Sequence, residues 1–321
     1  MPHNLETRRR FIAGLISGVV GAGLWGVSGT CAQFLFATYG ITPLFSTVVR
    51  SFFAGVAFFA AIFVARRAVL NRMATCAKVT KIALLVFGLC LFVDQFACTT
   101  AVALTNAGTA TVLQMLGTVF VMLYTCLVGR RFPRAIEAVG LVLALVATSL
   151  IAPQGDPTTL VLPAAGLFWG ILNAFSVAVY VLVPRHARLF EKFGSFPVTA
   201  VGMLITFVLS TVVYLATMGP QMFVAEVVLL DARGWLALIG GLTFLGTFLS
   251  FWLYLRGVSL VGSITGSLLG AVEPASAMMF SALLLGTVFT GADWIGLILM
   301  VGMLVLVTFS DGDDGAKPQA D

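Results

Sequence analysis

Long apolar segments separated by short polar breaks run through almost the whole of this 321-residue chain. A helix needs about 20 mostly apolar residues to cross a bilayer. Ten segments meet that condition, at residues 11–37, 44–65, 80–103, 106–128, 135–152, 161–183, 197–216, 234–255, 259–285 and 291–309. Hydrophobic residues form 60% of the chain and charged residues only 10%, so polar side chains are too few to cover a soluble fold. The sequence predicts an all-α integral membrane protein with ten transmembrane helices, and it excludes secreted disulfide scaffolds, nucleic-acid-binding proteins and disordered chains.

The positions of the basic residues predict the orientation in the membrane. In a ten-helix arrangement with a cytoplasmic N-terminus, sixteen of the 18 Lys and Arg residues fall in cytoplasmic segments, whereas Arg233 falls on the opposite side and Arg50 lies within a helix. This is the positive-inside pattern of membrane proteins. It predicts a multi-pass cell-membrane protein with both termini in the cytoplasm, and it explains the net charge of +5 without a nucleic-acid partner. Residues 1–10 and 310–321 are the predicted cytoplasmic termini, the second disordered, and 221–232 is a predicted short helix at the membrane interface.

The two halves of the chain resemble each other. A shift of 156 positions aligns residues 104–152 with 260–308 without a gap. At a slightly different shift, Tyr39-Gly40 and Pro43 match Phe193-Gly194 and Pro197. The halves, 11–152 and 161–309, contain five predicted helices each, an odd number, so they enter the membrane from opposite sides. The sequence therefore predicts two inverted five-helix repeats, an arrangement typical of secondary transporters with a substrate site near the midplane.

Glu273 and Pro274 lie in the middle of the predicted helix 259–285. A charge within the bilayer costs at least ~2.5 kcal/mol even on lenient scales, so it needs a reason. Proline removes a backbone hydrogen bond and bends a helix, and the freed carbonyl groups line a cavity or bond to neighbouring helices. Two interpretations of Glu273 stay open. It is either a substrate ligand or proton carrier, or a buried carboxyl that caps the broken backbone or pairs with another helix.

Asp94 and Gln95 lie in the middle of the predicted helix 80–103, and Arg50 lies toward the outer end of another helix. Asp94 is the best candidate for a proton-coupling group, because it is a carboxyl in an apolar surrounding. The alternative is an ion pair with Arg50 or a hydrogen bond to a neighbouring helix. Gln95 points about 100° away from Asp94, so both reach one cavity only if it is broad. Arg50 is expected to bind a substrate carboxylate, to extend to the membrane surface, or to pair with Asp94 or Glu273, and a structural role is favoured.

Five further residues within the predicted helices are candidate ligands: Trp25, Gln114, Trp169, Asn173 and Trp252. Aromatic rings in a cavity suit aromatic or cationic substrates through stacking and cation–π contacts, although a Trp also suits a lipid-facing or packed position. No metal site is predicted, because the five cysteines form no CxxC pair and the only two histidines lie in cytoplasmic segments.

Several short motifs occur in order along the chain: Leu24-Trp25-Gly26, Pro43 followed by Arg50-Ser51-Phe52-Phe53-Ala54, Glu273-Pro274, Leu284-Leu285-Gly286 and Asp293-Trp294-Ile295-Gly296. With these motifs the chain resembles the EamA-type transporters of the drug/metabolite transporter superfamily over essentially its whole length. Thr287 is a departure, since the family often has an acidic residue there. The resemblance implies export or exchange of amino acids, related metabolites or drugs through a central cavity lined by the first, third, fourth, sixth, eighth and ninth helices.

Together these features predict a secondary transporter that exports or exchanges small metabolites such as amino acids by alternating access, without a cofactor. Asp94 and Glu273 are the predicted titrating or ligand groups, with protons as a candidate coupling ion. One alternative is proton-coupled efflux of lipophilic cationic drugs. A less favoured alternative is a membrane-embedded enzyme that uses Asp94 and Glu273 as a carboxyl pair. No ATP-binding GxxxxGK[ST] loop is present in the chain. The oligomeric state stays open, and a monomer is compatible with the sequence.

Overall fold

The computed structural model describes residues 2–130, 132–151, 163–261 and 269–315, which form helices and no strand. The first half contains α1 (Pro2–Tyr39), α2 (Pro43–Ala74), α3 (Lys78–Leu104), α4 (Ala107–Gln114), α5 (Leu116–Val128) and α6 (Ala135–Ile151). The second half contains α7 (Ala164–His186), α8 (Leu189–Phe193), α9 (Ser195–Thr217), α10 (Gly219–Leu229), α11 (Ala232–Trp235), η1 (Leu236–Leu249), α12 (Ser250–Val261), α14 (Val272–Leu285) and α15 (Gly291–Gly315).

Seven helical segments of the described chain are long and apolar enough to cross a membrane: Arg8–Tyr39, Pro43–Val64, Lys78–Leu104, Ala107–Val128, Ala164–Pro184, Ser195–Thr217 and Ala232–Val261. The other three predicted spans, at 135–152, 259–285 and 291–309, coincide with shorter apolar helices at Ala138–Ala147, Val272–Leu285 and Gly291–Leu306. The all-helical class and the membrane character are therefore confirmed, and the count of ten transmembrane helices stays a prediction.

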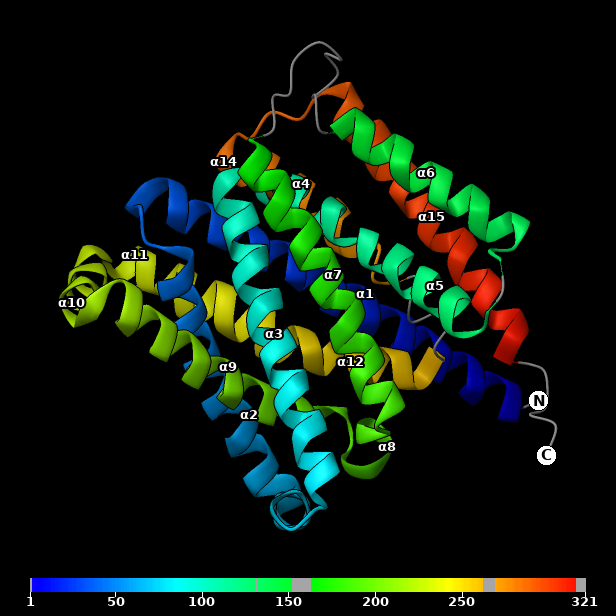
Figure 1. The fold of residues 1–321 in the computed structure, drawn as a ribbon, viewed down its shortest axis with the longest axis horizontal. Helices are drawn as coiled ribbons and strands as arrows, with labels where there is room; N and C mark the ends of the chain where they lie inside the picture. Colours follow the sequence, from blue (N-terminus) through cyan, green and yellow to red (C-terminus); the bar gives the residue numbers. More distant parts are fainter. Residues whose placement is uncertain (1, 131, 152–162, 262–268, 316–321) are drawn as a thin grey trace.

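The beginning of α1 and the end of α15 lie at the same end of the helix bundle (Figure 1). We call this end the terminal side; it also holds the turn between α2 and α3 and the short helix α8 (Figure 1). The far side is the other end, where α1 turns into α2 beside α10 and α11 (Figure 1). With 38 residues, α1 is about 57 Å long, enough to run from one side to the other.

The helices of the two halves pack in corresponding pairs. α1 packs on α12 and α3 packs on α7, while α2 packs on η1 and α9 packs on α3. Three further pairs join corresponding helices directly: α2 with α9, α4 with α14, and α6 with α15. If each helix is exchanged for its counterpart in the other half, this pattern of contacts maps onto itself. The packing is therefore consistent with two related five-helix halves.

Each half also interrupts a helix at an equivalent place. α4 and α5 meet at Met115, and α14 begins at Val272 after the turn residue Ala271. Met115 and Ala271 are 156 residues apart, the same shift that aligns the halves in sequence. Pro274 therefore lies in the first turn of α14, where its missing N–H is not needed. The expectation that Pro274 bends the middle of a continuous helix is wrong.

The predicted break between residues 255 and 259 is also wrong. Helical structure runs without interruption from Ala232 to Val261, through α11, η1 and α12. Arg256 lies near the end of this segment, with its guanidinium carbon 6.0 Å from the ring centre of Trp252. A long basic side chain can keep its charge at the membrane surface while its stem covers apolar groups, so the charge of Arg256 does not end the helix.

The middle of this long segment, η1, is a π-helix. The hydroxyl groups of Thr243 and Thr247 donate hydrogen bonds to carbonyl oxygens five residues earlier, at 2.8 and 3.1 Å. Gly246 is needed here, because a Cβ at this position would lie 2.4 Å from Oγ of Ser28 on α1. Long π-helical segments are rare and short ones often mark functional sites. η1 is therefore a candidate wall of the functional site.

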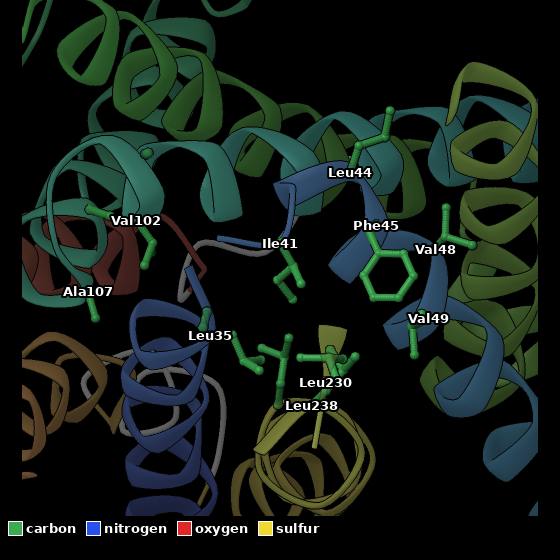
Figure 2. Packing of buried hydrophobic residues seen from close by; sticks show 14 of the residues in the cluster. Leu35, Ile41, Leu44, Phe45, Val48, Val49, Val102, Ala107, Leu230 and Leu238 are labelled. Atoms are coloured by element: carbon green, nitrogen blue, oxygen red, sulfur yellow. The ribbon is translucent and has the colours of Figure 1, made fainter. Parts of the chain in front are cut away.

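Two buried apolar clusters lie toward the two sides of the bundle. The Ile41 cluster lies toward the far side, where side chains from α1, α2 and the α10–η1 region point toward one another (Figure 2); it includes Leu35, Ile41, Phe45, Val48, Leu230 and Leu238. The Leu189 cluster lies toward the terminal side and includes Val69, Met73, Leu84, Leu189 and Phe193. The polar residues of the bundle centre lie between these clusters.

Two smaller predictions concern the chain outside the long helices. The segment 221–232 is mostly helical, since α10 ends at Leu229 and α11 begins at Ala232. The prediction of disorder from residue 310 onward is wrong for residues 310–315, because α15 continues through them. Residues 316–321 lie outside the described ranges.

Candidate functional site

Arg50 on α2, Asp94 on α3 and Glu273 on α14 come together in the bundle. They are far apart in the sequence, yet their charges lie close enough to act on one another. Each is half-buried, so part of each side chain stays accessible to a molecule of the size of water. Charged groups inside a membrane protein are costly and mark functional sites by default. We call this group the central charge cluster.

Asn173 on α7 positions the carboxyl group of Asp94. Its side-chain nitrogen donates hydrogen bonds to the carboxylate oxygen and to the backbone carbonyl of Asp94, at 2.9 and 3.0 Å. The hydrogen bond to a neighbouring helix that the sequence left open for Asp94 is therefore present. Asn173 is buried, and its own side-chain oxygen has no hydrogen-bond partner among the described residues. Such an orphaned buried acceptor is uncommon in proteins, and it leaves an acceptor beside the charge cluster.

Thr247 on η1 holds the side chain of Arg50. Nε of Arg50 donates a 2.7 Å hydrogen bond to the Thr247 hydroxyl, which in turn donates to the backbone of η1. Arg50 forms no ion pair with any residue in the described part of the chain. The expected ion pair of Arg50 with Asp94 or Glu273 is therefore not formed at contact distance. The guanidinium is oriented by a neutral hydroxyl, and its remaining N–H groups are donors.

Glu273 opens α14, and two neighbours position it. Its carboxyl group lies close to the side chain of Gln114 at the end of α4. The first turn of a helix also favours a negative charge, because backbone N–H groups point toward it. On α1, Gly26 allows a close approach, since a Cβ there would lie 2.9 Å from the Glu273 carbonyl oxygen and 2.5 Å from the Ala277 nitrogen. The helix breaks at Met115 and Ala271, one in each half, therefore bring the polar side chains of Gln114 and Glu273 close together.

Aromatic side chains lie beside the charges. The Trp25 ring packs on Tyr254 and Phe251 of α12, with ring centres 4.7 and 5.2 Å apart. Tyr180 on α7 lies close enough to interact electrostatically with both Asp94 and Glu273. Trp25, Tyr180 and Tyr254 are each half-buried. The cluster therefore combines one guanidinium, two carboxyl groups and an aromatic wall, which can bind a small molecule with both charged and apolar parts.

Three of the sequence candidates lie away from this cluster. Gln95 is buried, and its nitrogen donates to the sulfur of Met203 on α9 at 3.1 Å. Trp252 is 47% exposed on the outside of the bundle. Trp169 lies one helical turn from Asn173, but its ring packs on Phe96 in the Ile41 cluster. The structure therefore brings together Trp25, Arg50, Asp94, Gln114, Asn173 and Glu273, and it does not bring Gln95, Trp169 or Trp252 to them.

Sequence reasoning missed Thr247, which orients Arg50. Its only signal was a threonine inside an apolar run, which is common in transmembrane helices and does not by itself indicate a site. Within the described residues, no group of three His, Cys, Asp or Glu side chains is arranged to hold a metal ion.

Apolar helices that surround charged side chains in this way define an integral membrane protein with an internal polar site. The chain matches the EamA-like transporter family over residues 12–152 and 164–309, and it belongs to that family. It is therefore a multi-pass membrane transporter, and its family implies a small-molecule substrate. At Thr287, the departure from the family motif, the hydroxyl accepts a 2.8 Å hydrogen bond from Gln33 on α1.

Two similar proteins support this assignment. The chain is 32% identical to the "Uncharacterized inner membrane transporter YicL" of Salmonella typhimurium, over 92% of this chain and 95% of that protein. It also resembles a solved structure described only as "Crystal structure of protein", with a TM-score of 0.62, 18% identity, and coverage of 94% of this chain and 99% of that one. The first likeness supports an inner-membrane transporter, and the second supports the fold.

Proposed function

We propose that the chain is a secondary transporter that carries small zwitterionic metabolites, such as amino acids, by alternating access between two inverted halves. The observation that supports this proposal is the central charge cluster. Arg50, Asp94 and Glu273 come from helices of both halves and meet between the apolar clusters of the two sides. A site at the interface of two related halves is the common arrangement in secondary transporters.

The substrate class follows from the chemistry of the cluster. Thr247 occupies only Nε of Arg50, so the outer N–H groups of the guanidinium can donate to a substrate carboxylate. Asp94 and Glu273 can accept hydrogen bonds from a substrate ammonium group or carry a proton. The aromatic wall of Trp25 and Tyr254 suits an apolar substrate side chain.

The orientation is part of the proposal. We infer ten transmembrane helices with the terminal side in the cytoplasm, because the positive-inside pattern in the sequence puts sixteen of 18 basic residues there. A cysteine introduced at the terminal side by Lys192→Cys should react with an impermeant maleimide only from the cytoplasm. Arg233→Cys, at the start of the far-side helix α11, is the matched control and should react only from outside. Labelling of Lys192→Cys from outside would contradict the orientation.

Transport in proteoliposomes tests the site. We expect uptake of labelled amino acids, and Asp94→Asn and Glu273→Gln should abolish it or remove its dependence on a pH gradient. Trp25→Phe should weaken uptake, whereas Trp252→Phe, a matched change on the outer surface, should not. If both carboxyl variants transport like the unaltered protein at every pH, the assignment of the site is wrong.

Efflux of lipophilic cations coupled to protons is a second candidate. Two carboxyl groups face one guanidinium in the cluster, and aromatic rings beside carboxylates suit a cation. Arg50→Gln separates the two candidates. It should abolish transport of a substrate that is held through its carboxylate, whereas it should preserve or increase transport of a cation.

A further inference from the structure

A groove of about 470 Å³ runs between α2 and α9 on the outer surface of the bundle. Its walls are almost entirely apolar and include Phe52, Val56 and Phe63 of α2 and Phe207 of α9. The groove does not belong to the central charge cluster, since none of its lining residues is part of that cluster. The groove is formed where α2 packs against α9.

Small residues on α2 are part of the groove lining. They include Gly55 and Ala60. A Cβ on Gly55 would meet a single neighbour, Cβ of Met203, at an ordinary contact distance of 3.8 Å. A Cβ at this position therefore has room, and a larger side chain there would extend into the groove.

The groove faces outward from the bundle, where lipid surrounds a membrane protein. Phe52, Val56 and Phe63 are 43%, 53% and 56% exposed, as expected for side chains that contact lipid tails. The residues of α2 that line the groove run from Ser51 to Leu70, and the helix rises about 28 Å between them. The groove is therefore long enough to hold an acyl chain along α2.

A positive charge lies beside the terminal-side part of the groove. The Arg67 guanidinium lies 4.7 Å from the ring centre of Phe63, one helical turn away. Stacking on an aromatic ring holds a guanidinium in place and leaves its edge free to donate. Basic residues at this depth attract anionic lipid head groups. The groove thus combines apolar walls that can hold an acyl chain with a guanidinium that can bind a phosphate.

We propose that this groove binds an anionic phospholipid, with an acyl chain between α2 and α9 and the head-group phosphate at Arg67. The site complements such a lipid in polarity and charge. A zwitterionic lipid fits the apolar part equally well, but its head group carries a positive charge that Arg67 repels. The proposal rests on the membrane location of the chain and is independent of the transported substrate.

Binding of defined lipids to the purified full chain tests the proposal. The delipidated protein in a neutral detergent is titrated with phosphatidylglycerol or with phosphatidylcholine of the same acyl chains, and bound lipid is counted by native mass spectrometry. The unaltered protein should prefer phosphatidylglycerol. Arg67→Gln should weaken its binding about fivefold, the change expected for one basic residue at an anionic membrane surface, and should leave phosphatidylcholine unaffected.

Matched variants separate the head group from the groove. Arg72→Gln removes an exposed charge of α2 that does not line the groove and should leave binding unchanged. Gly55→Phe should weaken binding of both lipids, whereas Val64→Phe, at an 87% exposed position outside the groove, should not. Equal binding of the two lipids, or unaltered phosphatidylglycerol binding by Arg67→Gln, would overturn the proposal. A dimer that Gly55→Phe converts to a monomer, with no lipid retained, would overturn it too, because the occupant would then be a second copy of the chain.

Discussion

The corner between α1 and α2 and the corner between α7 and α9 occupy equivalent places in the two halves, one on the far side and one on the terminal side. Both bend at a glycine with positive φ, 64° at Gly40 and 84° at Gly194. Each is followed by a proline in the first turn of the next helix, Pro43 in α2 and Pro197 in α9. The sequence match between the corners thus corresponds to a glycine with positive φ in each of them.

Different contacts hold the two corners. On the far side, buried Glu226 of α10 accepts hydrogen bonds from the backbone nitrogen of Thr42 and the hydroxyl of Tyr214. The hydroxyl of Tyr39 donates to Asp231 at 2.5 Å. On the terminal side, the corner is held by Leu189 and Phe193, which are buried in the Leu189 cluster.

This difference indicates how the two sides respond to change. Hydrogen bonds need a definite geometry and leave costly orphaned groups when a partner is removed, whereas apolar contacts weaken in proportion to the buried surface lost. If the halves alternate as proposed, the far side opens by breaking specific polar contacts, and the terminal side opens by separating apolar surfaces. Substitutions at the two corners test this comparison.

Glu226→Ala is expected to have the largest effect. It leaves the Thr42 N–H and the Tyr214 hydroxyl without an acceptor, at about 1–3 kcal/mol for each buried donor. The thermal midpoint in detergent should fall. Cys98 lies one helical turn from Asp94 on α3 and close enough to Arg50 to interact with it electrostatically. In a variant that keeps only Cys98, an impermeant maleimide should label this residue faster from the far side. Glu226→Gln, which keeps an acceptor oxygen, should retain most of the stability.

Glu191→Ala is the matched control on the other corner. Glu191 is exposed and pairs with Arg188 at 3.8 Å, and exposed pairs contribute about 0–1 kcal/mol. Equal effects of Glu191→Ala and Glu226→Ala would show that hydrogen bonds do not hold the far side.

Leu189→Ala should have the next largest effect. Leu189 is fully buried in its cluster, and truncation of a buried leucine costs about 2–5 kcal/mol. We expect a lower thermal midpoint and faster labelling of Cys98 from the terminal side. Phe190→Ala, at a 42% exposed neighbour, is the control and should change neither. A lower midpoint with unchanged labelling would mean that the cluster stabilises the fold without closing that side.

Gly40→Ala and Gly194→Ala should each have a smaller effect. An L residue in the left-handed region costs about 1–2 kcal/mol, and a Cβ on Gly40 has no neighbour within 4 Å to add a clash. The control is Gly23→Ala inside α1, also in open space, which should raise the midpoint slightly. An unchanged or raised midpoint in either corner variant, measured by thermal unfolding, would contradict the need for a glycine there.

Tyr39→Phe should have the smallest effect and a distinct pH dependence. The Tyr39 hydroxyl, together with the backbone N–H groups of Gly234 and Arg233, lowers the pKa of Asp231 by hydrogen bonding to its carboxylate. Because the pKa is lower in the folded state, the contribution to stability is complete above the ordinary Asp pKa of about 4 and is lost as the pH falls through the lowered pKa.

Thermal unfolding at several pH values measures this effect. The midpoint difference between the unaltered protein and Tyr39→Phe should stay constant from pH 6 to 8 and vanish on acidification. In an Asp231→Asn background the same substitution should show no pH dependence in the acidic range. A difference that persists at low pH would show that the tyrosine acts by packing alone.

Much of the fold was predictable from the sequence, because hydropathy acts locally along the chain. The break at Thr105 and Asn106 was predicted correctly, and Asn106 caps α4 by accepting a hydrogen bond from the Thr109 nitrogen at 2.8 Å. The errors fall where a local signal had two meanings. Arg256 resembled a loop residue but lies inside α12, and Pro274 resembled a kink but lies in the first turn of a helix.

The site was predictable as a set of residue types and not as a geometry. Gln95 and Gln114 were equally plausible in sequence, as were Trp252 and Trp25. Side chains on one helix face different directions every 100°, and only the packing of neighbouring helices decides which direction is the centre. Thr247 was missed for the same reason, because its role depends on Arg50, 197 residues away.

The sequence by itself determined that this is a helical membrane protein with two related halves, since apolar length, charge asymmetry and the 156-residue shift are properties of the linear chain. It also determined that three charged residues had to be accommodated within the membrane. Only the tertiary structure decided that Arg50, Asp94 and Glu273 meet, which partners hold each of them, and why one corner is held by hydrogen bonds and the other by apolar packing. Those contacts join residues from different helices, and no local pattern in the chain encodes them.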